Sequence, residues 1–141
     1  MGSMTPDQIS AVEESVARVD LDRLTADFYR RAFAEDPTLS EMFTSDPAVQ
    51  RVRFAAELHE IVRSMRSMDA FEPAVRALGE RHRSYGVRAA HYRLMGKALM
   101  AAFAAELGDR WTPEVEEAWQ LAYNLTAESM LLGAMECGAD S

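Results

Sequence analysis

Residues 78–92 read LGERHRSYGVRAAHY, and the pattern that leads into them is the most specific in this chain. Phe71, Val75, Leu78, His82 and Tyr85 follow one another at intervals of four, three, four and three residues. This is the period of one face of an α-helix, so His82 lies on the apolar face of a predicted helix. A buried imidazole needs a partner. The spacing leaves two interpretations open: a core histidine bonded to a backbone carbonyl, or a ligand.

Helix starts recur along the rest of the chain. Four prolines follow small polar residues, an arrangement typical of the first turn of a helix, at Thr5-Pro6, Asp36-Pro37, Asp46-Pro47 and Thr112-Pro113. A capping-box variant, Asp69 to Glu72, predicts a further start at Asp69. Gly86 and Gly108 are predicted breaks. Apolar residues recur at threes and fours between these signals, and no stretch has a strand's alternation. The sequence therefore predicts an all-α fold of six or seven helices.

The composition limits which partners and which cellular compartment we expect for this protein. The chain has 141 residues and a formal net charge of −8, which argues against a nucleic-acid binder because such a protein needs a basic face. The longest apolar run, 98–105, is far shorter than the ~20 residues that cross a bilayer, so no membrane span is expected. The first residues do not have the basic and apolar pattern of a leader, so we expect no export signal, and the single cysteine, Cys137, has no partner for an internal disulfide. We expect a cytoplasmic protein.

The length fits one domain, and no Gly/Ser linker or repeat divides it. We interpret residues 1–3 as a cloning remnant, 4–137 as the domain and 138–141 as a loose tail. Two other sites are excluded by spacing. His59-Glu60 begins like a zinc-protease helix, but Arg63 stands where the second histidine would be, and no Glu-x-x-His pair of a di-iron bundle is present. We interpret His59 and His91 as surface or structural residues.

The chain resembles a bacterial single-domain globin, similar to the haem domain of flavohaemoglobins, over nearly all of its length. The matching segments are 28–33, 37–43, Gln50, 78–87, His91-Tyr92, and 107–109 leading through Thr112-Pro113 to Trp119 and Tyr123. The resemblance implies a globin fold of six to eight helices around a pocket that holds haem b. It also implies that His82 is the proximal ligand to the iron, which leaves the sixth position open for dioxygen or another diatomic gas.

The resemblance implies roles for further residues. Tyr29 and Gln50 match the distal pair that stabilises bound dioxygen, and Phe54, one turn after Gln50, would close the distal pocket. Tyr92 matches a proximal tyrosine, but Ala134 stands where the family has a glutamate, which removes a source of electron donation to the histidine. The predicted lining of the pocket is completed by Phe43, Leu78, Val87 and Met95, with Arg53, rather than Arg51, as the better partner for a haem propionate.

Two functions follow from this resemblance. The first is reversible dioxygen binding, with conversion of nitric oxide to nitrate as a further activity. A chain of 141 residues would have no room for the flavin and nicotinamide domains of flavohaemoglobins, so turnover would need an external reductase. The second is a haem-based gas or redox sensor, or an interaction module on a globin fold. Its support is the missing glutamate and the apolar residues spread over several faces of the last helix, which also allow a homodimer.

Overall fold

The computed structural model describes residues 4–43 and 46–139, and all the regular structure in these ranges is helical. The elements in chain order are α1 (Pro6–Arg18), α2 (Leu21–Glu35), the short 3-10 helix η1 (Pro37–Met42), α3 (Pro47–Ser64), α4 (Met68–Ser84), α5 (Ala89–Leu107), the short 3-10 helix η2 (Gly108–Arg110) and α6 (Pro113–Ala139). The all-α prediction is confirmed.

Side-chain caps fix most of the helix starts where the sequence predicts them. Thr5 forms a full capping box with Gln8 at the start of α1, and Asp36 and Asp46 accept backbone N–H groups at the starts of η1 and α3. The predicted start at Asp69 is wrong. A capping box from Asp69 to Glu72 would make Asp69 the N-cap, but the N-cap is Ser67, two residues earlier. α4 begins at Met68, and the backbone carbonyl of Ser67 accepts the N–H groups of residues 70 and 71.

Two glycines end helices by adopting a backbone conformation that other residues rarely take. Gly86 has a φ of 93° and lies in the turn between α4 and α5, and Gly108 has a φ of 57° at the end of α5. Both predicted breaks are confirmed. The turn at Gly86 matters for the site, because it brings the first residues of α5 back toward the C-terminal end of α4, where His82 lies.

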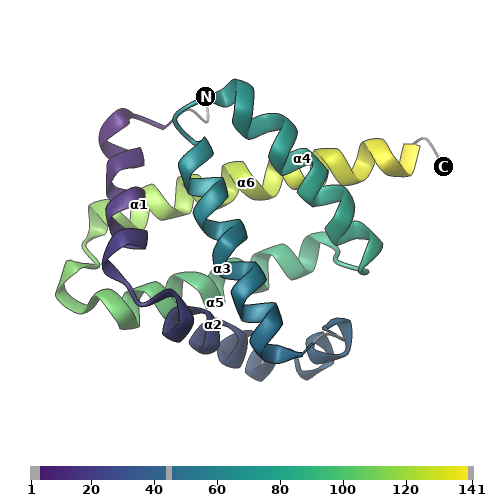
Figure 1. Ribbon diagram of the computed structural model, residues 1–141, viewed down its shortest axis with the longest axis horizontal. Helices are drawn as coiled ribbons and strands as arrows, with labels where there is room; N and C mark the ends of the chain where they lie inside the picture. The colour runs from purple at the N-terminus through teal and green to yellow at the C-terminus, as the bar shows by residue number, and fades with distance from the viewer. Residues whose placement is uncertain (1–3, 44–45, 140–141) are drawn as a thin grey trace.

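In Figure 1, α3 and α4 run across α6 rather than along it, and α4 packs most extensively on α6. Two glycines allow this close crossing. A Cβ atom added to Gly79 of α4 would lie 1.9 Å from the backbone oxygen of Met130, and one added to Gly133 of α6 would lie 2.2 Å from the backbone oxygen of Arg76. Since no real Cβ approaches a backbone atom so closely, glycine is required at both positions for this packing.

The core lies between these crossings. Phe28, Phe71 and Phe103 are fully buried, and the Phe103 ring lies 4.2 Å from that of Trp119 on α6. Within the described residues, no helix is both long enough and apolar enough to cross a membrane. α6 continues through Ala139, so residues 138 and 139, which we expected in a loose tail, are helical. Residues 1–3 and 140–141 lie outside the described residues.

Candidate functional site

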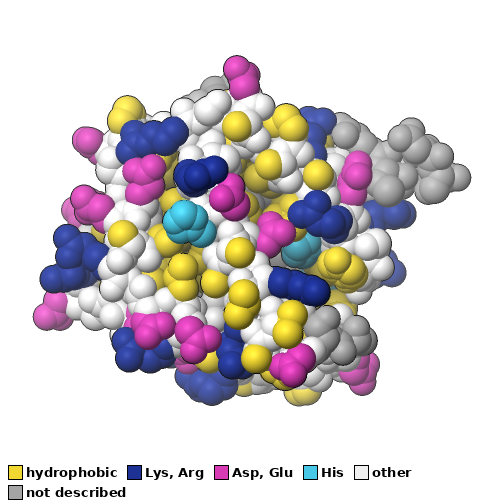
Figure 2. Space-filling model, viewed as in Figure 1, with side chains coloured by type: hydrophobic (Ala, Val, Ile, Leu, Met, Phe, Trp, Pro, Cys, Tyr) yellow, Lys and Arg dark blue, Asp and Glu magenta, His cyan; other side chains and the backbone are white. Residues whose placement is uncertain are grey.

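A cavity of about 320 Å³ opens among α2, η1, α3, α4, α5 and α6. All ten residues predicted for the site line it: Tyr29, Phe43, Gln50, Arg53, Phe54, Leu78, His82, Val87, Tyr92 and Met95. The lining is mainly apolar, and apolar side chains reach the surface between α3 and α4 among charged side chains of both signs (Figure 2). An apolar cavity with a few convergent polar groups is typical of a site for a small molecule or cofactor.

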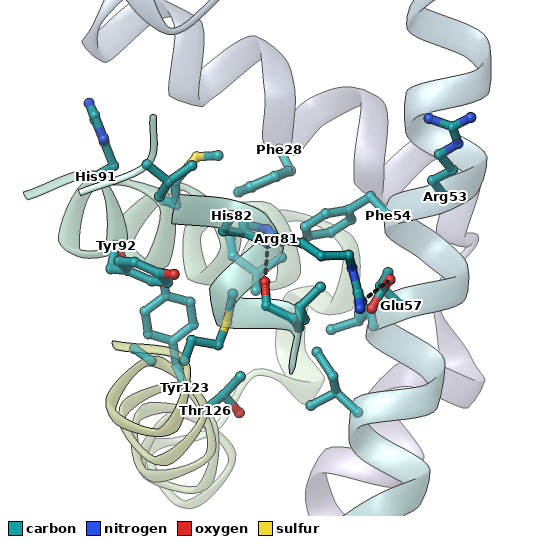
Figure 3. Close-up of a pocket in the computed structure, with 18 of the residues that line it drawn as sticks. Phe28, Arg53, Phe54, Glu57, Arg81, His82, His91, Tyr92, Tyr123 and Thr126 are labelled. Atoms are coloured by element: carbon teal, nitrogen blue, oxygen red, sulfur yellow. Dashed lines mark hydrogen bonds and ion pairs between the residues drawn. The ribbon is translucent and has the colours of Figure 1, made fainter. Parts of the chain in front are cut away.

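His82 lies in the last turn of α4 and is half-buried in the wall of this cavity (Figure 3). Its Nδ1 is 2.9 Å from the backbone oxygen of Leu78, one turn earlier. A carbonyl can only accept, so Nδ1 carries the proton and the lone pair of Nε2 is free. Burial lowers the pKa of His82, although the Leu78 carbonyl and the carboxylate of Glu57 oppose this shift. A neutral imidazole with a free Nε2 can bind a metal.

The two interpretations left open for His82 do not exclude each other. One ring nitrogen is bonded to a backbone carbonyl, as in a core histidine, and a bond of this kind leaves the other nitrogen able to act as a ligand. The described residues contain no group of three or more histidine, cysteine or carboxylate side chains that could hold a metal ion by themselves. A metal bound at His82 would have to bring further ligands with it.

Tyr29 and Gln50 contribute the polar groups on another wall of the cavity. Tyr29 is 8% exposed, and burial raises the pKa of its hydroxyl, so the group stays protonated at neutral pH. The Nε2 of Gln50 donates to the Tyr29 oxygen across 3.5 Å, at the long limit of a hydrogen bond. This bond uses the oxygen of Tyr29 and leaves its hydrogen available to a third group.

An aromatic cluster holds Tyr29 in place. Its ring packs edge-on against the rings of Phe43 and Phe54, with centroid distances of 5.3 and 5.7 Å. The centroid of the Phe33 ring lies 5.8 Å away. Phe54 also stacks on Phe28 at 4.6 Å, so α2 and α3 are joined by rings. The direction of the Tyr29 hydroxyl is therefore set by packing on several sides.

Tyr123 was matched by the resemblance, but its position in the cavity wall was not predicted. Its hydroxyl donates to the backbone oxygen of Tyr92 in the first turn of α5. Its ring covers Gly96, where an added Cβ would lie 2.5 Å from the ring, and burial strongly raises the pKa of Tyr123. In Figure 3 the rings of Tyr92 and Tyr123 lie side by side on the α6 side of the cavity. The signal that could have found Tyr123 is Gly96, a glycine inside a strongly apolar helix.

Charged groups lie at the solvent edge of the cavity. Arg53 is exposed and lines the cavity, whereas Arg51 does not line it and pairs instead with Asp22 across 3.7 Å. Sequence reasoning missed the two other charged residues of the lining, Glu57 and Arg81, which pair across 3.4 Å. Their positions in the sequence could have indicated that they line the site, because Glu57 comes two turns after Gln50 and Arg81 directly precedes His82.

His91 has two features that bear on its interpretation as a surface or structural residue. Its Nδ1 accepts the backbone N–H of Arg88 across 2.9 Å, so it caps the start of α5 and the structural role is confirmed. It also lines the cavity, which the sequence did not predict. The pattern of apolar residues gave no indication of this, because the turn at Gly86 sets which side of α5 faces the site.

Comparison with known proteins agrees with this architecture. The family model described as Globin matches residues 26–130. The flavohemoprotein of Bacillus subtilis is 30% identical over 111 residues, covering 77% of this chain and 28% of the relative. The flavohemoprotein of Deinococcus radiodurans is 30% identical over 135 residues, covering 91% of this chain and 33% of the relative. The chain thus spans a third or less of the length of these relatives.

A solved structure, a hexacoordinated haem protein from an anhydrobiotic tardigrade, superposes with a TM-score of 0.79. It is 17% identical in sequence, and the match covers 94% of this chain and 96% of that one. At this identity the likeness speaks for the fold, which the match to the family model over residues 26–130 identifies independently. The chain belongs to the globin family.

Proposed function

We propose that this globin binds haem b through His82 and reversibly binds dioxygen on the side of the haem that faces Tyr29. One observation carries the proposal: the free Nε2 of His82 is presented in an apolar cavity that also contains the Tyr29 hydroxyl and the Gln50 amide. A porphyrin needs apolar walls and one axial base, and the residues present fit both needs. The name of the flavohemoprotein relatives, which share about 30% identity with the chain, supports the same cofactor.

Six of the lining residues have a proposed part in holding the group. His82 supplies the axial nitrogen, and the apolar side chains of Phe43, Leu78, Val87 and Met95 pack on the ring. Arg53, at the solvent edge, is the proposed partner of a propionate. When bound, haem supplies an iron with an open coordination position for a diatomic gas.

Tyr29 and Gln50 give this site its proposed preference for dioxygen. The Tyr29 hydrogen is free to donate, because Gln50 donates to the Tyr29 oxygen rather than accepting from it. Hydrogen bonds to a ligand that carries negative charge are worth about 1.5–3 kcal/mol each, so they favour dioxygen over carbon monoxide. Phe54 packs beside Tyr29, where its ring would help to exclude water from this wall.

The environment of His82 favours reversible binding over strong electron donation. The hydrogen-bond partner of its Nδ1 is the neutral Leu78 carbonyl, and Ala134 provides no carboxylate on α6. A carboxylate partner would raise the basicity of the imidazole, whereas a carbonyl does so only weakly. We therefore propose gas binding as the principal activity.

Conversion of nitric oxide to nitrate is the proposed further activity. Nitric oxide and dioxygen together contain all the atoms of nitrate, and the negative charge of nitrate corresponds to one electron for each turnover. An external reductase would supply this electron in the cytoplasm. The relatives named flavohemoprotein are well over twice the length of this chain, so their activity comes to this chain only as a proposal.

The test is titration of the purified chain with haem. We expect a Soret band near about 410 nm that saturates at one haem per chain, and reversible spectral changes when the ferrous form meets dioxygen. His82→Gly should lose the spectrum of a histidine-bound haem and regain it with added imidazole. A spectrum unchanged by H82G would remove His82 from the site, and failure to bind haem would overturn the proposal.

A further inference from the structure

The ion pair between Glu57 and Arg81 joins two walls of the cavity. Glu57 belongs to α3 and Arg81 to α4, and the Nη2 of Arg81 lies 3.4 Å from Oε1 of Glu57. Both residues line the cavity, yet their side chains are 43% and 52% exposed. A side chain that lines a cavity and also meets solvent lies at its opening. Figure 3 shows the pair spanning from α3 to the turn of α4 that carries His82.

The position of Arg81 makes this pair relevant to the cofactor. Arg81 directly precedes His82, so its guanidinium is attached to the same helical turn as the proposed iron ligand. Its partner in this structure is a carboxylate. The groups by which haem meets solvent are also carboxylates, namely its two propionates. A guanidinium binds either kind of carboxylate through the same N–H groups.

We propose that Arg81 is a binding residue for a haem propionate, and that Glu57 holds this position in the haem-free chain. On haem binding, the propionate replaces the Glu57 carboxylate at Arg81 and the link between α3 and α4 opens. This inference rests on the proposed function, since it requires haem in the cavity. Arg53, the propionate partner already proposed, lies at the opening one turn before Glu57 on α3. Arg81 would be a second basic residue at this opening.

The energetics of such an exchange are favourable. An exposed ion pair contributes little net stability, so releasing Glu57 into solvent costs little. Arg81 remains paired with a carboxylate before and after the exchange, so no charge loses its partner. Haem-free protein keeps its two walls joined at the opening, and haem meets only a weak barrier there.

The exchange gives the two partners opposite roles, which the rate of haem loss can separate. In transfer of haem to an excess of a high-affinity apoglobin acceptor, Arg81→Gln should lose haem about threefold to fivefold faster than wild type, the range expected from an exposed charge pair. Glu57→Gln should lose haem no faster than wild type, and should bind haem at least as fast. Thermal unfolding of the haem-free variants will show that each one folds.

Two neighbouring residues provide matched controls for charge. Arg83 is exposed on α4 two residues after Arg81, and Glu60 is exposed on α3 three residues after Glu57. Arg83→Gln and Glu60→Gln change the net charge of the chain by the same amounts as the test variants. Both should leave the rate of haem loss within experimental error of wild type, because neither residue lines the cavity.

A chemically altered haem separates propionate binding from a structural role. With the dimethyl ester of haem, which has no carboxylate to offer, wild type and R81Q should lose the cofactor at the same rate. The proposal is overturned if R81Q and E57Q accelerate loss equally, if R81Q has no effect with ordinary haem, or if the R81Q effect persists with the ester. Because all variants are compared while loaded with haem, these outcomes are distinct from a failure of the chain to bind haem at all.

Discussion

The two sides of the cavity are built in different ways. Behind His82, α4 and α6 meet backbone to backbone, and only Gly79 and Gly133 make that approach possible. On the other side, α2 and α3 meet through rings, with Phe54 packed against Phe28 and Tyr29. The contact between α4 and α6 has no side chain that could move to relieve a clash. The contact between α2 and α3 consists of side chains that can be substituted.

This difference separates the contact that holds the fold from the contact that would control the proposed gas ligand. A change at the backbone crossing must move a helix, and His82 moves with α4. A change at Tyr29 or Gln50 alters a hydrogen bond and leaves the backbone where it is. We therefore expect substitutions behind His82 to act mainly on stability, and substitutions in the wall of Tyr29 to act mainly on the kinetics of the bound gas.

The largest effect is expected at the crossing itself. Gly79→Ala places a Cβ where the backbone oxygen of Met130 now lies, and should lower the free energy of unfolding of the haem-free chain by about 3 kcal/mol, the upper end of the usual cost of overpacking. Urea unfolding followed by circular dichroism measures it. Ala77→Ser, exposed on the same helix, should stay within about 0.5 kcal/mol of wild type. A G79A variant as stable as A77S would show that the crossing is not tight.

The next effect is expected at Tyr29. Tyr29→Phe keeps the ring packing and removes the hydroxyl, so dioxygen should dissociate at least about tenfold faster, with stability little changed. Stopped-flow displacement by carbon monoxide measures the rate. Tyr85→Phe, an exposed tyrosine at the cavity edge, is the control and should leave the rate unchanged. An equal off-rate in Y29F and wild type would remove Tyr29 from the mechanism.

A smaller change is expected at Gln50. Its amide reaches the Tyr29 oxygen only across 3.5 Å, so Gln50→Leu removes a weak bond and one further donor. We expect dioxygen to dissociate about threefold faster, in the same stopped-flow experiment. If Q50L exceeded Y29F in effect, Gln50 rather than Tyr29 would be the main donor.

The smallest effect is expected from pH. Burial raises the pKa of Tyr29 above its ordinary value near 10, so the hydroxyl keeps its proton and its donor role below that pH, and loses both only as pH rises through the raised pKa. The dioxygen off-rate should therefore be constant from about pH 6 to about pH 9. An acceleration with a midpoint below about pH 9 would mean that the hydroxyl ionises in the working range.

The sequence predicted most helix starts because they depend on local signals, whereas most of the predicted lining of the cavity came from the resemblance to a known family. The caps at Thr5, Asp36 and Asp46 act within a few residues, and the apolar period placed His82 on an inward face. Even the error at Asp69 was one of position only, since an acidic residue is common both at a cap and in the first turn.

The residues that sequence reasoning missed depend on how separate helices meet. Glu57 and Arg81 read as ordinary solvated charges on their own helices, and only the crossing of α3 and α4 brings them together. The bond from Tyr123 to Tyr92 likewise joins residues 31 positions apart. Such contacts are set by helix packing, which a pattern along a single helix does not encode.

The central claim is that His82 holds the iron as a neutral imidazole whose Nδ1 donates to a backbone carbonyl. Resonance Raman spectroscopy of the ferrous gas-free form, or of the carbon monoxide complex just after photolysis, tests this most directly. We predict an iron–histidine stretching band at the low frequency of a neutral imidazole, lost in His82→Gly and replaced by an iron–imidazole band when imidazole is added. A band that persists in H82G without imidazole, or one at the higher frequency of a carboxylate-bonded histidine, would contradict the account.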